Sequence, residues 1–510
     1  MQASLSKNSS DFTIRKRSAT SVVVAGFFAV LFLMQAAANN FVSLDSARSL
    51  NILFSTLMLV MASGVAVRYA MLNRIYVLTP LPWFYVACAA YFGFGPLAWY
   101  FADYTTVAYI DFASHAPIND IGVFQANLLS AAGVAIVSLT LGLLQFFFDW
   151  EGKAPRDYLE HLNGRAVAKM FWLSIALGAS VKYLLVLPSS SGLVGFEIPN
   201  FISQLTLLLK VAIVLGYVAS AKQVRTVKVP LNLLIATELI TSLMSASKSE
   251  ILFVVLMVII GRHFAQRSMR QAILLGGAAV LLYATFLANF VLFVRSQYSV
   301  TGVSSVSSLA DATKEYFNAN ESELGVGDGV QLWWARLVFS NYQVFGINQY
   351  DSGQAGHTLE TAPWAFTPRF LFPDKPILNP GGELSDAMLS GSSEWVKTSM
   401  TYFAEGYWNK GPLGLIIVSF WAGFAFFVLT YLVFSEIAAG RMGIALAAVN
   451  SIQMGYSVES FFVSTFLGGF ALALLYALLG HLIDQFNART LDGRLGGRRN
   501  IRLALPLHSV

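Results

Sequence analysis

Residues 123–148 read VFQANLLSAAGVAIVSLTLGLLQFFF, a stretch that contains no Asp, Glu, Lys or Arg. A transmembrane helix needs about 20 predominantly apolar residues, so this stretch can cross a bilayer. The rest of the chain is similar, because 56% of its 510 residues are hydrophobic and 12% are charged. That charged fraction is about half the value for an average soluble domain. The sequence therefore predicts an integral membrane protein and excludes soluble, fibrous and disordered classes.

Twelve apolar runs follow one another along the chain, and those at 231–244 and 251–260 are weak. A helix satisfies its backbone hydrogen bonds internally, whereas loops and open strands cannot lie in lipid. We therefore expect an all-α polytopic membrane protein with about 12 transmembrane helices. The other ten runs are at 21–38, 50–67, 81–101, 123–148, 170–187, 201–219, 272–294, 413–434, 444–454 and 461–479.

The distribution of Lys and Arg predicts the orientation. Basic residues precede the first run, recur after every second run and fill the C-terminal tail. Short basic loops stay in the cytoplasm, so both termini are predicted to be cytoplasmic. The first run also resembles a signal peptide that ends at Ala36–Ala38, but its removal would disturb this alternation, and we expect an uncleaved helix.

One predicted outer loop, at 296–410, is far longer than the others. Structureless loops of that length are uncommon, so an ordered extracytoplasmic subdomain is expected. Its many Trp, Tyr and Phe side chains can bury surface or stack on sugar rings. The predicted organisation is a cytoplasmic N-terminal tail (1–20), helices one to nine (21–295), the extracytoplasmic subdomain (296–410), helices ten to twelve (411–482) and a basic cytoplasmic tail (483–510).

Two turns are candidates for a functional site. The sequence SASKSE at 245–250 separates runs of about 14 apolar residues, or roughly 21 Å of helix, which is too short for roughly 30 Å of hydrocarbon. Lys248 is therefore expected in a depression below the outer surface, where serine hydroxyls and helix-end amides suit a diphosphate. The alternative is a capped turn in which Lys248 pairs with Glu250. A similar turn, GYSVES, lies at 455–460.

Other charged residues lie within or beside the apolar runs, where ionisable groups are costly. Arg295 lies where the ninth run ends, as an interfacial anchor or as a ligand for a lipid phosphate. Lys182, Lys210 and Glu238 lie within the runs, and we expect structural ion pairing among them.

Two segments carry a resemblance to a known family. They are PRFLFPDKP at 368–376 and TYFAEGYWNKG at 401–411, which precedes the tenth run. With the late outer loop, they resemble bacterial Wzy-type oligosaccharide repeat-unit polymerases. The 247–250 turn lies where related O-antigen polymerases and ligases carry a Ser-Arg-Gly type turn. Lysine replaces that arginine at position 248, and the His-Asn motif of the ligases is absent. The resemblance covers the topology of the whole chain and about 40 residues of motif.

The resemblance implies a glycosyltransferase at the outer face of the bacterial inner membrane. It would transfer a growing glycan from undecaprenyl diphosphate onto a lipid-linked repeat unit, and the product would be O-antigen, capsule or exopolysaccharide. Expected partners are the undecaprenyl-diphosphate-linked oligosaccharide, membrane lipids, a chain-length regulator and a flippase of the same pathway, with no nucleic acid. No cofactor or metal is expected, because the first outer loop offers only Asp45. A lipid-linked oligosaccharide flippase is the alternative function, and a non-catalytic component of an envelope complex is a third.

This chemistry assigns roles to particular residues. A departing diphosphate needs fixed cations, and an attacking hydroxyl needs a proton acceptor. The candidate acceptors are Glu405, then Asp374, then His357, although Glu405 could instead be a helix cap or a salt-bridge partner. Tyr402, Trp364, Trp333 and Trp334 could stack on sugars or form the core of the loop. The candidate cations are Lys248, Arg295, Arg336, Arg369 and Lys375.

Overall fold

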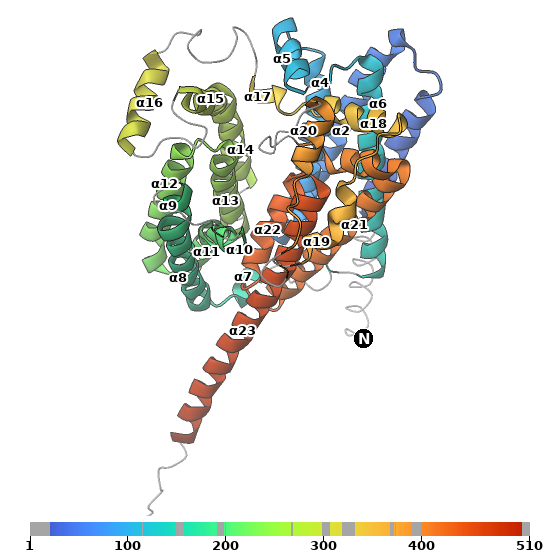
Figure 1. Cartoon of the computed structure of the whole chain (residues 1–510). Helices are drawn as coiled ribbons and strands as arrows, with labels where there is room; N and C mark the ends of the chain where they lie inside the picture. The colour runs from blue at the N-terminus through green and yellow to red at the C-terminus, as the bar shows by residue number, and fades with distance from the viewer. Residues whose placement is uncertain are drawn as a thin grey trace, which may run out of the picture.

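The chain forms an all-helical bundle (Figure 1). The computed structural model describes residues 21–501, except for residues 115, 149, 151–157, 191–197, 199, 267–268, 298–305, 319–331, 368–371, 373 and 390–398. Eleven helices within these residues are long and apolar enough to cross a membrane, which confirms the predicted class. They are Ser21–Ala38, Leu44–Leu72, Pro80–Trp99, Asp120–Phe147, Gly164–Ser189, Gln204–Ala221, Arg225–Met244, Lys248–Gln266, Arg270–Val291, Tyr402–Ala438 and Phe462–Gln485.

The expected number of spanning helices, twelve, is one too many. The run at 444–454 forms α22 (Ala445–Tyr456), which has 12 residues. A helix of that length is about 18 Å long and cannot cross roughly 30 Å of hydrocarbon. Instead, α22 packs against α3 (Pro80–Cys88) and α23 (Gly468–Ile501). It ends inside the bundle, at the second of the two turns that the sequence singles out.

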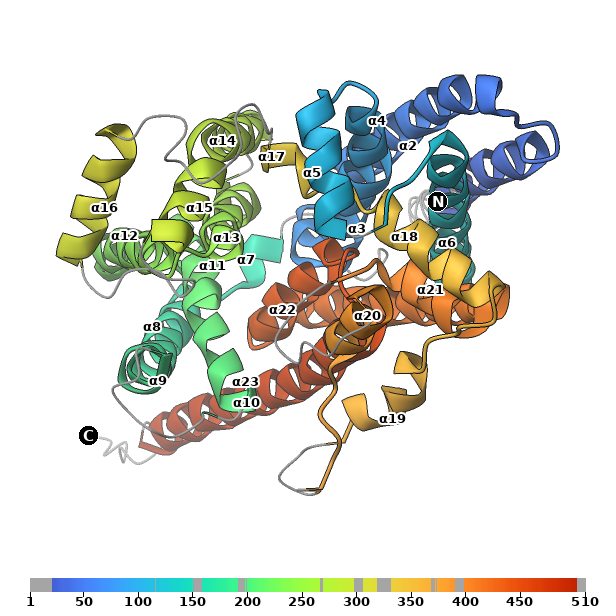
Figure 2. The same cartoon turned by 45° about the horizontal axis from the view of Figure 1, so that its top comes forward.

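The helices lie in two groups that are side by side in Figures 1 and 2. The two groups touch where α11 packs on α22. Both turns lie near this junction. The first group comprises Ser21–Ala38, α2 (Leu44–Leu72), α3, α6 (Asp120–Phe147), α21 (Tyr402–Ala438), α22 and α23. The second comprises α8 (Gly164–Val181), α11 (Leu207–Ala221), α12 (Lys228–Met244), α13 (Lys248–Gln266), α14 (Met269–Leu282) and α15 (Ala288–Gln297).

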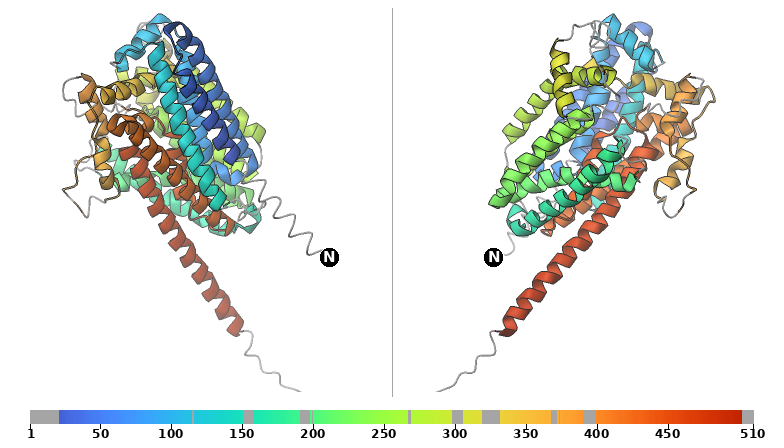
Figure 3. Two further views of the ribbon diagram at one scale, coloured as in Figure 1. Left: turned by 90° about the vertical axis from the view of Figure 1, so that its right-hand side faces the viewer. Right: turned by 60° about the vertical axis from the view of Figure 1, so that its left-hand side comes forward.

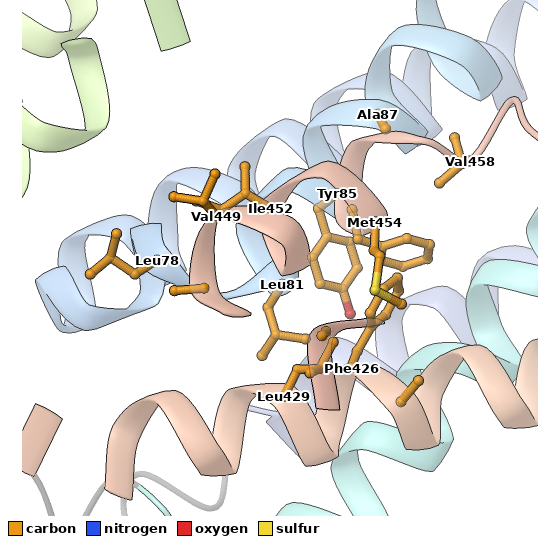
Figure 4. Close-up of a cluster of buried hydrophobic side chains, with 14 of the residues drawn as sticks. Leu78, Leu81, Tyr85, Ala87, Phe426, Leu429, Val449, Ile452, Met454 and Val458 are labelled. Atoms are coloured by element: carbon orange, nitrogen blue, oxygen red, sulfur yellow. The ribbon is translucent and has the colours of Figure 1, made fainter. Parts of the chain in front are cut away.

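A buried apolar cluster joins α3, α21 and α22 (Figure 4). Tyr85 of α3 and Phe426 of α21 are fully buried, and Met454 of α22 is 3% exposed. Helices in lipid associate mainly through close packing of this kind. Val458, just beyond α22, lies next to Ala87 (Figure 4), which is partway along the span Pro80–Trp99. The turn after α22 therefore lies below the end of that span.

α21 is two helices joined by a sharp break. Lys410 and Gly411 have non-helical backbone angles, and Gly411 has a φ of +57°. A positive φ favours glycine, which has no Cβ to clash. After the break the chain folds back, so that Gly414 packs against the backbone carbonyl of Gly406. The short first part, which starts at Tyr402, is thereby placed beside the turn after α22.

Replacement of Gly414 by alanine is expected to destabilise the protein by about 1–3 kcal/mol or more. A Cβ at position 414 would collide with the carbonyl oxygen of Gly406, and that backbone has little room to move. Thermal unfolding of the purified variant in detergent measures the effect. The control is Gly276→Ala on α14, where a Cβ would meet nothing within 4 Å. Equal stability of the two variants would contradict the close packing.

The predicted outer segment folds into short helices that spread over one end of the bundle (Figure 2). α18 packs along both α6 and α21 and so ties this segment to the first group of helices. α23 projects from the opposite end (Figure 3). The helices and 3₁₀ turn of the segment are α16 (Val306–Asn318), α17 (Leu332–Ala335), α18 (Ser340–Asp351), η9 (Thr358–Thr361), α19 (Ala362–Ala365) and α20 (Pro380–Leu389).

Candidate functional site

The two turns that the sequence singles out lie together at the junction between the helix groups. Tyr456 ends α22, and its ring centroid is 5.9 Å from that of Phe253 on α13. Glu459 follows Tyr456 by three residues, and Glu250 precedes Phe253 by three residues. The fold therefore brings the two turns together, although they are about 200 residues apart in the chain.

Glu459 has the properties of a proton acceptor. Its Oε2 atom is buried and has no hydrogen-bond partner among the residues that the structure describes. Burial raises the pKa of the Glu459 carboxyl to about 7. A general base works best when its pKa lies near the operating pH, because it is then ionised often enough and still binds the proton well. In the sequence Glu459 is marked only as part of a turn, and nothing there indicates its burial.

Contacts from the 399–405 segment fix this turn. The Tyr402 N–H donates to the carbonyl oxygen of Val458 at 3.3 Å. The Ser399 hydroxyl donates to the carbonyl oxygen of Glu459 at 2.6 Å. The backbone N–H of Phe462 donates to Oε2 of Glu405. Three hydrogen bonds therefore hold the backbone around Glu459 and leave its side chain available.

Glu405 is fully buried, and both of its carboxyl oxygens accept hydrogen bonds. Oε1 accepts the Thr358 hydroxyl at 2.6 Å. The Asn409 amide donates to that hydroxyl at 2.9 Å and to the Glu405 carbonyl oxygen at 2.8 Å. This arrangement links the outer segment, α21 and the start of the last span. It favours the second role expected for Glu405, that of a capping residue.

Four π-helical turns occur among the described residues. Such turns are frequent at functional sites. The turn at Phe462–Leu467 (η10) follows Glu459 closely. The turns at Ala89–Phe94 (η2) and Tyr283–Leu287 (η7) include Tyr91 and Tyr283. The fourth, Lys182–Val186 (η4), begins at an ion-paired lysine.

A chain of ion pairs crosses the second helix group. Lys182 Nζ is 2.8 Å from Oε1 of Glu238, and Lys210 Nζ is 2.7 Å from its Oε2. The predicted pairing among these three residues is thus confirmed. Lys210 Nζ is also 2.7 Å from Oε2 of Glu250, a partner that the sequence did not indicate. Lys248 begins α13 two residues before Glu250 and is half-buried.

The remaining candidate cations lie in or near the predicted outer segment, or outside the described part. Arg336 is exposed and directly follows α17. The Lys375 ammonium donates to the Thr367 carbonyl at 2.9 Å. Arg295 lies in α15, but its side chain is outside the described atoms, and Arg369 lies outside the described residues.

The other candidates for acid–base chemistry or sugar binding are dispersed. Asp374 is exposed, and so is His357, whose Nδ1 is 3.2 Å from a carboxylate oxygen of Glu360. Tyr402 is fully buried against aromatic rings. Trp364 is 36% exposed on α19 and can contact a bound molecule. Trp334 is buried in a small apolar cluster that also includes Ile110, and the Trp333 ring lies 5.8 Å from that of Phe94.

No protein-family model, curated protein or solved structure matches this chain. Among the described residues, no group of three or more His, Cys, Asp or Glu side chains is placed to hold a metal ion. The functional assignment therefore depends on the site geometry and on the motif residues of the sequence.

Proposed function

We propose that the protein is a glycosyltransferase of the bacterial inner membrane that polymerises lipid-linked oligosaccharide repeat units. It transfers a growing glycan from undecaprenyl diphosphate onto a new repeat unit at the outer face. The observation that carries the proposal is the contact between the two turns, where the Tyr456 ring lies 5.9 Å from that of Phe253, together with the buried Oε2 of Glu459, which has no hydrogen-bond partner among the described residues. The transfer requires a proton acceptor for the attacking hydroxyl and cations for the departing diphosphate.

In the proposed reaction the acceptor hydroxyl gives its proton to Glu459 as its oxygen attacks the anomeric carbon of the donor. The bond between that carbon and the diphosphate oxygen breaks, and the diphosphate leaves with the electron pair. Lys248 and Arg336 stabilise the charge that develops on it, with Arg295, Arg369 and Lys375 as further candidates. Glu459 then releases the proton to water, and the carboxylate is restored.

Glu405 and the aromatic residues have supporting roles in this proposal. Glu405 is a positioning residue, because it holds the N–H of Phe462 and so fixes the turn that presents Glu459. Trp364, on the outer segment, is the candidate for sugar stacking because part of its ring is exposed. η9 and α19 of the outer segment contact the start of the last span, and in this proposal they limit the access of water, which would otherwise compete with the acceptor hydroxyl.

A flippase for the same lipid-linked oligosaccharide is the second candidate function. The observation that favours it is the buried chain of ion pairs at Lys182, Glu238 and Lys210. Ionisable groups at membrane depth are typical of transport pathways. A flippase, however, has no need of a proton acceptor such as the unpaired carboxylate oxygen of Glu459.

A polymerisation assay tests the proposal. Purified protein in nanodiscs is incubated with a lipid-diphosphate-linked repeat unit, with and without EDTA, and the products are separated by size. We expect a ladder of longer glycans in both conditions. Translocation of the same substrate across proteoliposomes without any ladder would refute the polymerase and favour the flippase.

A further inference from the structure

Lys182, Glu238 and Lys210 form a buried trio with an unbalanced charge. Two ammonium groups share one carboxylate, so the trio carries a net charge of +1. The Glu238 side chain is 0% exposed and that of Lys210 is 3% exposed. A buried charge is costly unless an opposite charge compensates it. The trio therefore needs an additional anion.

Glu250 supplies that anion, but its side chain is more exposed to solvent than those of Lys182, Glu238 and Lys210. Its side chain is 47% exposed, whereas its partner Lys210 is buried. Because about half of the Glu250 side chain is exposed, its carboxylate can move into water more readily than that of Glu238, which is 0% exposed. Glu250 is therefore the one anion of this chain of ion pairs that can be exchanged for another.

The position of Glu250 also suits a different anion. It lies in the first turn of α13, a 19-residue helix whose N-terminal amides attract negative charge. The Ser247 and Ser249 hydroxyls and the half-buried Lys248 lie in the same turn. Phosphate oxygens can accept hydrogen bonds from all of these groups, and a phosphate carries more negative charge than a carboxylate.

We propose that Glu250 is an exchangeable counter-ion, and that Lys210 binds a phosphate group of a lipid carrier when the Glu250 side chain moves aside. The lipid is favoured over free phosphate because Lys210, Glu238 and Glu250 all belong to membrane-spanning helices. The identity of the carrier as a polyprenyl diphosphate rests on the proposed function, whereas the exchange itself does not.

Binding of farnesyl diphosphate to the full-length protein in nanodiscs tests this proposal. Glu250→Gln removes the competing charge, and we expect its Kd to fall about fivefold relative to the wild type. The ligand should also raise Tm more in the variant than in the wild type. The matched control is Glu360→Gln, since Glu360 is 59% exposed and pairs only with His357 among the described residues. Its Kd should stay within about twofold of the wild-type value.

A double variant shows whether the effect passes through Lys210. In Lys210→Gln with Glu250→Gln, Lys182 and Glu238 remain as a neutral pair, so the fold is maintained. We expect the gain in affinity to disappear. An unchanged or weaker affinity in Glu250→Gln, or a gain that persists in the double variant, would overturn the exchange.

A competition experiment distinguishes a lipid-linked phosphate from a free phosphate as the ligand. Inorganic pyrophosphate should compete poorly with farnesyl diphosphate, and equal affinity would overturn the lipid assignment. The outcomes are separable from those of the polymerase assay. A protein that shows the exchange but forms no ladder would refute the polymerase alone, and a polymerase with no change of Kd in Glu250→Gln would refute the exchange alone.

Discussion

Replacement of Glu459 by glutamine is expected to lower the polymerisation rate at least a hundredfold, and binding of the lipid-linked substrate should be preserved. General-base catalysis typically contributes about 10²–10⁴ to a rate. Glutamine has almost the same shape as glutamate but cannot take a proton. Because Oε2 of Glu459 has no partner among the described residues, its replacement breaks no hydrogen bond shown there. Single-turnover assays at saturating substrate measure the chemical step.

The pH dependence of the wild-type rate provides a second test of Glu459. Burial raises the pKa of this carboxyl to about 7, and only its ionised form can accept a proton. The rate should therefore rise with pH up to about 7 and level off above it. At pH 6 about one tenth of the groups are ionised, so the rate should be about one tenth of the plateau value. The residual activity of Glu459→Gln should lack this dependence.

Three other variants distinguish Glu459 from the candidates that the sequence suggests. Glu405→Gln places an amide N–H near the donors of Thr358 and Phe462, so it should lower Tm as well as activity. Asp374→Asn and His357→Gln alter exposed side chains and should retain most of the wild-type rate. A normal rate in Glu459→Gln, or a comparable loss without destabilisation in Asp374→Asn, would transfer the role of base to another residue.

Replacement of Glu238 by leucine is expected to destabilise the protein by about 3–5 kcal/mol. Lys182 and Lys210 both lose a carboxylate that lies within 2.8 Å, and Lys182 then has no ion-pair partner among the described residues. Removal of one member of a buried ion pair leaves a charge uncompensated, which is why the effect is large. Unfolding in SDS with mild detergent measures the change in free energy.

A second substitution distinguishes the effect of the uncompensated lysine charge from the effect of the altered side-chain shape at position 238. In Lys182→Met with Glu238→Leu, only Lys210 and Glu250 remain, and they form a neutral pair. We expect this double variant to recover at least half of the lost stability, since apolar replacement of a whole ion pair is often neutral. If the double variant is less stable than Glu238→Leu alone, charge balance is not the cause of the destabilisation.

The sequence predicts the spanning helices well because lipid imposes one requirement on every segment. Apolar runs of sufficient length become helices, and eleven of the twelve expected runs do so as membrane spans. The exception, α22, is apolar for a different reason. It is enclosed by α3 and α23, so its composition reflects burial in protein instead of contact with lipid. Hydropathy alone does not distinguish these two environments.

The candidate site is less predictable from the sequence. The two short turns are visible in the sequence because their flanking runs are short, and the structure brings them together. The pairing of Glu250 with Lys210 and the burial of Glu459 depend on contacts between distant segments. The motif at 401–411 draws attention to Glu405. Only the fold shows that the Thr358 hydroxyl and the Phe462 N–H donate hydrogen bonds to its carboxylate.

The four π-helical turns have a consequence for how this chain can change. Three of them, η2, η4 and η7, join two α-helical stretches, whereas η10 begins its span. Each of these three is equivalent to one residue inserted into an α-helix, so the helix faces before and after it are out of phase by about 100°. Loss of a single residue from Ala89–Phe94 would restore regular helix and rotate everything beyond it, although no functional side chain need be altered. At these three places the number of residues sets the direction of the side chains beyond the turn, so we expect insertion or deletion of a single residue there to be more damaging than most substitutions.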